Sequence, residues 1–220
     1  MGIQPPSPSP QSHNSQQFLL DGWKITQLAL WSEGALFLLS LPWILSTPTT
    51  VPTSLFVPLA IGIISTIPLL LAMSLLSRLV ENWTPLQKSL FGEQLQDLQR
   101  NFIFPLSRAL NDVQILIIAL LSGIGEEVFF RGLLLWLLED ISPQTASVIC
   151  SSLLFALLHF VGNFRRFSRL ISVYFIAGIY LSSLYLLYQS ILVPITCHAC
   201  FNLVSLRLNR KRANAERNES

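Results

Sequence analysis

Long apolar stretches set the strongest constraint on how this chain folds. Six stretches are each long enough to cross a bilayer, which takes about 17–25 residues in a helix. They cover residues 26–46, 55–77, 113–138, 144–163, 170–189 and 191–207. Only 12% of the 220 residues are charged, about half the fraction found in soluble domains. We therefore predict an all-α, polytopic membrane protein with about six transmembrane helices.

Basic residues predict the orientation of these spans, because Lys and Arg favour the cytosolic side of a membrane. Lys24 precedes the first span, and the connections after the first and third spans carry no base. The bases after the second, fourth and sixth spans are Arg78, Lys88, Arg100 and Arg108, then Arg165, Arg166 and Arg169, then Arg207, Arg210, Lys211, Arg212 and Arg217. This alternation predicts that both termini are cytosolic.

Composition divides the chain into four segments. Residues 1–17 are rich in Pro, Ser and Gln, which predicts a disordered cytosolic tail. Residues 18–111 hold two spans and a cytosolic connection, 112–206 form a membrane core, and 207–220 form a basic cytosolic tail. The start of the chain has neither a secretory signal nor a transit peptide, and this favours the plasma membrane of a bacterium.

The connection after the second span, residues 78–112, contains apolar residues at helical spacing among polar ones. These residues are Leu86, Leu90, Phe91, Leu95, Leu98 and Phe102. The pattern predicts an amphipathic helix along the inner membrane surface or, alternatively, a soluble helix packed on the spans.

Three charged residues interrupt the third span. A charge near the membrane centre costs on the order of 2.5–3.5 kcal/mol. Glu127 and Arg131 are four residues apart, so an ion pair on one helix face would lower this cost. Glu126 points about 100° away from Glu127 and has no such partner. An unpaired glutamate within a span is a functional candidate.

Two of the three histidines also lie within spans. His159 follows Phe155 by four residues, His198 precedes Asn202 by four, and His13 lies in the N-terminal tail. One such histidine alone would be interpreted as a core residue. However, polar groups in lipid-facing helices must find one another, so we predict one shared, water-accessible cluster. It contains Glu126, Glu127, Arg131, His159, His198 and Asn202.

This set of side chains is suited to hydrolysis. A carboxylate and a neutral imidazole can polarise a water molecule, while an amide and a second imidazole can donate to an oxyanion. Glu126, His159 and His198 could instead bind a divalent metal such as zinc. Either arrangement indicates cleavage of an acyl bond, above all a peptide bond.

The depths of the candidate residues do not match if the helices are straight. Glu126 would lie near mid-membrane and His159 near the cytosolic face, a difference on the order of 10 Å at about 1.5 Å per residue. Gly123 and Gly125 precede the glutamates and could allow a kink or break. A further carboxylate, Glu33, lies near the cytosolic end of the first span, where it could reach the interface.

Three motifs occur in order, each in its own span: E-E-x-x-x-R from Glu126, F-x-x-x-H from Phe155 and H-x-x-x-N from His198. This set resembles the CPBP family of intramembrane proteases, which includes type II CAAX prenyl endopeptidases and bacteriocin-processing relatives. The similarity covers about residues 112–206, whereas the first two spans carry no matching motif. The resemblance implies a membrane enzyme of eight or fewer helices that cleaves peptide bonds near the cytosolic side.

The resemblance also implies residue roles. Glu126 and His159 would activate the water, and His198 with Asn202 would form the oxyanion site. The peptide or protein substrate would meet the enzyme at the lipid bilayer, with a prenylated C-terminal motif, a leader peptide or a membrane protein as the options. Nucleic acid is not an expected partner, and the oligomeric state stays open.

Glu127 and Arg131 would orient Glu126 and brace the helices. The family is often described as metalloproteases, but a metal-free glutamate mechanism fits the residues as well. We favour the metal-free mechanism, in which no cofactor is required, because the amide of Asn202 is a poor zinc ligand. Zinc remains the alternative.

Two other functions are compatible with a polar cluster inside the membrane. A non-catalytic scaffold or immunity-type relative would keep the cluster to hold its helices together. A small transporter or proton-coupled channel would need a continuous polar path, and the second and fifth spans offer little beyond Ser and Tyr. We therefore rank the transporter last.

Overall fold

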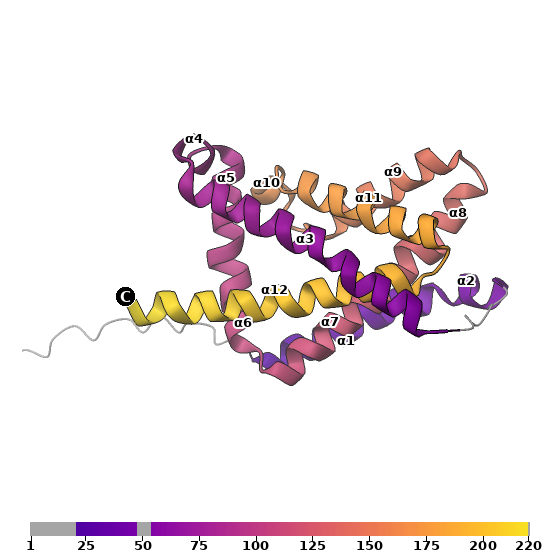
Figure 1. Cartoon of the computed structure of the whole chain (residues 1–220), viewed down its shortest axis with the longest axis horizontal. Coiled ribbons are helices and arrows are strands. Elements are labelled where there is room, and N and C mark those ends of the chain that lie inside the picture. Colours follow the sequence, from indigo (N-terminus) through magenta and orange to yellow (C-terminus); the bar gives the residue numbers. More distant parts are fainter. Residues whose placement is uncertain (1–20, 48–53, 220) are drawn as a thin grey trace, which may run out of the picture.

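The computed structural model describes residues 21–47 and 54–219, and within these ranges it contains helices and no strand. The predicted all-α membrane fold is therefore confirmed (Figure 1). The tail predicted for residues 1–17 lies outside the described residues.

Four helical segments of the described chain are long and apolar enough to cross a membrane. They are Gly22–Ser46, comprising α1 (Gly22–Leu39) and α2 (Leu41–Ser46); α3 (Phe56–Asn82); Asp112–Glu139, comprising α7 (Asp112–Glu127), the π-helix η2 (Val128–Leu134) and α8 (Leu135–Glu139); and α11 (Ile171–Tyr188). The other two predicted spans correspond to α9 (Gln144–Leu158), a shorter apolar helix, and to the first part of α12 (Leu192–Glu219).

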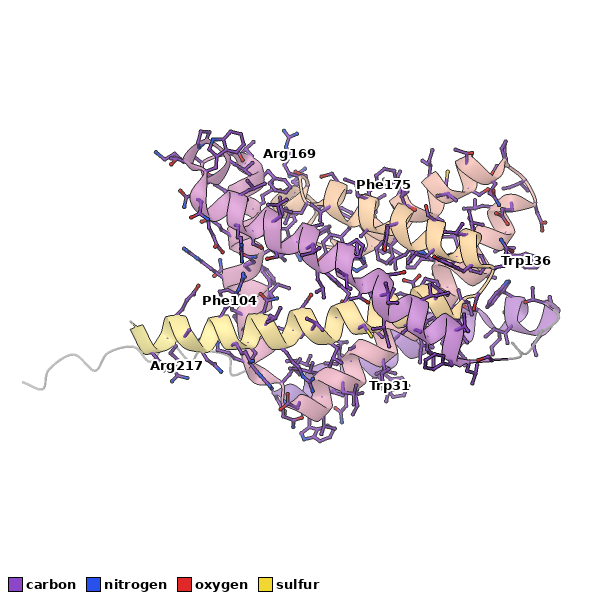
Figure 2. The ribbon with its side chains drawn as sticks, in the orientation of Figure 1. Trp31, Phe104, Trp136, Arg169, Phe175 and Arg217 are labelled. Carbon is purple, nitrogen blue, oxygen red and sulfur yellow. The ribbon has the colours of Figure 1, made fainter. Side chains whose placement is uncertain are left out.

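The connections between these helices gather at two opposite ends of the molecule. In Figure 1, α4, α5, α6, α10 and the C-terminus lie towards the left, whereas α2 and α8 lie towards the right. The labelled side chains follow the same division, with Arg169 and Arg217 towards the left and Trp136 on the right (Figure 2). Arg169 and Arg217 therefore lie towards the same end of the molecule as α10.

A crossing segment of short helices spans the left-hand end in Figure 1. It consists of α4 (Thr84–Gln87), α5 (Leu90–Leu98), η1 (Gln99–Ile103) and α6 (Phe104–Ala109). Leu95 is buried with Val80, Phe160, Phe167 and Leu170 in one core cluster. Part of the apolar side of α5 therefore packs on the end of α3 and on the connection before α11, whereas Leu90 and Phe102 are exposed. Both sequence-based alternatives fit this arrangement.

An ion pair ties the crossing segment to the connection that follows α9. Arg166 of α10 (Phe164–Phe167) donates from Nε and Nη2 to the two carboxylate oxygens of Asp97, at 2.5 and 2.7 Å. These hydrogen bonds hold the pKa of Asp97 below its usual value. In addition, the backbone N–H of Arg169 donates to Gln94 Oε1 at 2.9 Å. The chain just after His159 is thereby fixed at this end of the molecule.

Close helix packing around α12 depends on glycines. A Cβ atom at Gly62 of α3 would lie 2.5 Å from Thr196 Cβ, and one at Gly123 of α7 would lie 2.9 Å from Ala199 Cβ. Gly125 meets α1 in the same way, since its Cβ would lie 2.7 Å from the Glu33 carbonyl oxygen. The expected break at Gly123 and Gly125 is wrong, because α7 continues unbroken to Glu127. The role of these glycines is to let neighbouring helices approach one another closely.

Replacing Gly62 by Ala is expected to destabilise the protein, because the new methyl group overlaps α12. Overpacking of this kind costs about 1–3 kcal/mol, so the midpoint of thermal unfolding in detergent should fall. Gly34→Ala is the matched control, since a Cβ there meets nothing within 4 Å; it should leave the midpoint unchanged or raise it. Equal midpoints for the two variants would contradict the packing described.

Candidate active site

The centre of the site is the carboxylate of Glu126. Its Oε2 atom lies 3.7 Å from His159 Nε2 and 3.9 Å from His198 Nε2. The same oxygen is buried and has no hydrogen-bond partner among the described residues. These distances exceed those of direct hydrogen bonds and suit groups that share a bridging water. Residues from α7, from the C-terminal end of α9 and from α12 therefore meet around the carboxylate of Glu126.

Glu127, the neighbouring carboxylate, is fully buried and bonded to two partners. Its Oε1 atom accepts from Arg131 Nη1 at 2.9 Å and lies 2.7 Å from His198 Nδ1. Arg131 is also completely buried, so the pair exists as the spacing predicts. The hydrogen bonds of Glu127 are made to Arg131 and His198, and none that the structure describes is made to Glu126. Glu127 therefore orients the imidazole of His198.

Arg131 connects the pair to another span. Its Nη2 donates to the carbonyl oxygen of Gly178 at 3.0 Å, and its Nε donates to Ser182 Oγ at 3.4 Å. The guanidinium carbon also lies 4.5 Å from the ring centre of Phe155, within the range of a cation–π interaction. Arg131 thus fastens η2 to α11 and α9.

Hydrogen bonds at Nδ1 determine what the two rings present to Glu126. His198 Nδ1 faces a carboxylate oxygen, and His159 Nδ1 lies 2.9 Å from the carbonyl oxygen of Phe155. Carboxylate and carbonyl oxygens only accept, so Nδ1–H is the donor in both rings. In the neutral rings, each Nε2 therefore carries a lone pair on the side of Glu126.

Aromatic rings hold His159 in place. Its ring centre lies 4.5 Å from that of Phe155, as their spacing of four residues predicts, and 4.5 Å from that of Tyr174. Tyr174 belongs to α11 and was not predicted as a site residue. An aromatic residue in an apolar span carries no sequence signal that would link it to a histidine fifteen positions earlier.

Asn202 contacts α7 one turn before Glu126. Its Nδ2 donates to Ser122 Oγ at 2.7 Å, which fixes the plane of the amide. Ser122 is another residue that the sequence did not single out. Because Ser122 lies four residues before Glu126, a search of the helix face that carries Glu126 would have included it.

The depth mismatch expected between Glu126 and His159 does not occur. Helix α9 ends at Leu158, and His159 is its C-cap residue, whereas the sequence predicted a span reaching residue 163. The chain therefore leaves the helix at the level of Glu126. On the other side of the site, the π-helix η2 begins directly after Glu127, and π-helical turns are often found at functional sites.

Glu33 lies beside the site. A Cβ atom placed on Gly125 would lie 2.9 Å from Glu33 Oε2, so the carboxyl group rests on the backbone next to Glu126. Glu33 Oε2 is buried and has no hydrogen-bond partner among the described residues. The helix that carries Glu33, α1, packs against the third span there.

The described residues do not form a metal site as they are placed. No group of three or more His, Cys, Asp or Glu side chains in this part of the chain could hold a metal ion. Two ligands on one tetrahedral zinc ion lie about 3.3–3.6 Å apart, which is shorter than the 3.7 and 3.9 Å from Glu126 Oε2 to the two Nε2 atoms. We therefore derive no step through a metal.

Fold and site together define a polytopic helical membrane protein with a buried carboxylate–imidazole site. Residues 109–204 match the family model described as type II CAAX prenyl endopeptidase Rce1-like. This match confirms the family resemblance inferred from the three motifs, and the segment forms an Rce1-like domain. It supports an intramembrane endopeptidase of the CAAX type. No curated protein and no solved structure matches the chain.

Replacing Arg131 by Met should destabilise the fold strongly, because it leaves the buried carboxylate of Glu127 without its counter-ion. Breaking a buried pair in this way costs about 3–5 kcal/mol, measurable as the free energy of unfolding in detergent. Arg212→Met, which removes an exposed pair with Glu81, is the control and should have little effect. A stable Arg131→Met protein would contradict the structural importance of the buried pair.

Proposed function

We propose that this protein hydrolyses a membrane-proximal peptide bond, with Glu126 as the base that activates water. The observation that carries this proposal is the buried, unpartnered Oε2 atom of Glu126 facing two imidazole nitrogens. A carboxylate in an apolar span is costly, and one with no partner of its own is suited to accept a proton during a reaction.

In the proposed reaction, a water molecule lies between Glu126 Oε2 and His159 Nε2. Glu126 takes a proton as the water oxygen attacks the carbonyl carbon of the peptide bond, and His159 orients the water through its lone pair. The same proton then passes from Glu126 to the leaving nitrogen as the carbon–nitrogen bond breaks. The carboxylate is thereby restored.

The oxyanion formed in the first step would be stabilised by His198 and Asn202. Asn202 gives one N–H to Ser122, which leaves the second for the oxyanion. His198 donates through Nε2 when both of its nitrogens carry a proton, and Glu127 Oε1 at 2.7 Å supports that cation. Glu127 and Arg131 are positioning groups in this scheme, because they act through His198.

The family description points to a protein or peptide substrate at the bilayer, with a prenylated C-terminal motif as the first candidate. Leader peptides or membrane proteins are the alternatives in a bacterium. We place the catalytic core at residues 112–206, between an N-terminal part (18–111) and a basic tail (207–220). The basic end of the molecule would face the cytosol of a bacterial cell, with both termini on that side.

A non-catalytic membrane scaffold is the second candidate. The hydrogen bonds of Arg131 to Gly178 and Ser182 favour it, because they show that part of the cluster joins helices. This role accounts for Glu127 and Arg131. It does not account for Glu126, whose Oε2 atom joins nothing.

Glu126→Gln is expected to abolish cleavage of a farnesylated CAAX-type peptide, because an amide cannot take the proton from water. The variant should unfold at the same temperature as the wild-type protein. Glu139→Gln, at an exposed position of α8, is the matched control and should retain full activity. Full activity of Glu126→Gln would exclude the mechanism, whereas loss of stability with no cleavage by the wild-type protein would favour the scaffold.

A chelator tests the metal-free mechanism. Because the mechanism uses only Glu126 and His159 on the water, cleavage should continue after treatment with a strong chelator and dialysis. The cleavage rate and the zinc content of the same sample are the measurements. Loss of activity that returns on addition of zinc would show that a metal activates the water instead.

A further inference from the structure

Glu33 brings a third carboxyl group to the site from a helix outside the Rce1-like domain. It belongs to α1, whereas the family match begins at residue 109. The carboxyl group of Glu33 interacts electrostatically with both Glu126 and His198. Its Oε2 atom is buried and has no hydrogen-bond partner among the described residues.

The packing of α1 explains how Glu33 reaches the site. α1 packs mainly on α7, and Gly125 provides the space for contact. A Cβ atom on Gly125 would lie 2.7 Å from the Glu33 carbonyl oxygen and 3.0 Å from Glu33 Cβ. Any side chain at position 125 would therefore push Glu33 away from its neighbour, Glu126.

The remainder of α1 is suited to lipid. Leu30 and Trp31 are largely exposed, at 53% and 77%, and little of the α1–α2 segment is buried. A carboxyl group in such a helix is costly, and the buried Oε2 atom of Glu33 contributes no hydrogen bond among the described residues. Groups that are unfavourable for stability and lie beside a reactive site are typical of functional positions.

We propose that Glu33 binds the substrate, with a carboxyl oxygen accepting a hydrogen bond from a backbone N–H of the peptide next to the cleaved bond. An extended peptide in a membrane site needs acceptors for those of its N–H groups that are shielded from water. Glu33 Oε2 supplies such an acceptor beside Glu126. The inference rests on the proposed peptidase function and assigns to α1 a part of the substrate site.

The test uses the full-length protein in detergent with a farnesylated CAAX-type peptide. Cleavage by the wild-type protein and none by Glu126→Gln establishes the proposed function first. Failure at this stage contradicts the proposed function, and the inference about Glu33 falls with it. If the wild-type protein cleaves the peptide and Glu126→Gln does not, the comparison of Glu33 variants tests the role of Glu33 alone.

Glu33→Leu should lower kcat/KM by about tenfold to a hundredfold, the effect of leaving a buried N–H group of the peptide without a hydrogen-bond partner. Glu33→Gln keeps an acceptor oxygen and should stay within about threefold of the wild-type protein. Glu33→Leu should also unfold at the same temperature or higher, because a lipid-compatible side chain replaces an unpaired carboxyl group. Gln27→Leu, an exposed polar-to-apolar change on α1, is the control and should change nothing.

A binding measurement separates substrate contact from chemistry. In the inactive Glu126→Gln protein, adding Glu33→Leu should weaken binding of the same peptide by a similar factor, measured by fluorescence polarisation. Unchanged kcat/KM and binding in Glu33→Leu would overturn the inference. So would equal losses in Glu33→Leu and Glu33→Gln, or a loss that accompanies a lower unfolding temperature, since these outcomes indicate another role.

Discussion

The buried ion pair between Glu127 and Arg131 is the interaction on which the remainder of the site depends. Both side chains are completely buried, and neither could remain there alone, because an unpaired charge in a span is costly. Their further hydrogen bonds reach His198 on α12 and Gly178 on α11. The cost of one charge pair is thereby offset by contacts that join three spans and set the orientation of an imidazole.

Glu126 differs from its neighbour in the partners of its carboxylate. Glu127 Oε1 is bonded to an arginine and a histidine, whereas no hydrogen bond of Glu126 is described; the Oε2 atoms of both glutamates are buried without a hydrogen-bond partner among the described residues. One carboxylate is thus structural and orienting, and the other is available for chemistry. The rings of Phe155 and Tyr174 on either side of His159 keep the second imidazole facing Glu126.

Much of this arrangement can be predicted from physical rules applied to the sequence. The ion pair follows from a spacing of four residues, and the meeting of Glu126 with His159 and His198 follows from the need of polar groups in lipid for partners. The contacts of Ser122 and Tyr174 could not be predicted in the same way. They join residues on separate helices, and no spacing along the chain encodes how those helices are rotated.

Positions along the membrane were the least predictable part. The apolar stretch containing His159 continues to residue 163, but the helix ends at Leu158, and the connection that follows is bonded through Arg166 to Asp97. The packing of α1 on Gly125 brings Glu33 beside the site, which its place in the sequence did not indicate. In both cases a tertiary contact between distant segments decides the depth of a single residue.

The central claim is that Glu126, His159, His198 and Asn202 surround one peptide bond during hydrolysis. An experimental structure of the Glu126→Gln protein with an uncleaved farnesylated peptide tests it most directly. The account predicts the carbonyl carbon of the cleaved bond within about 3.5 Å of a water held by residue 126 and His159, with its oxygen facing Asn202. A peptide bound elsewhere, or a residue 126 that faces lipid, would contradict it.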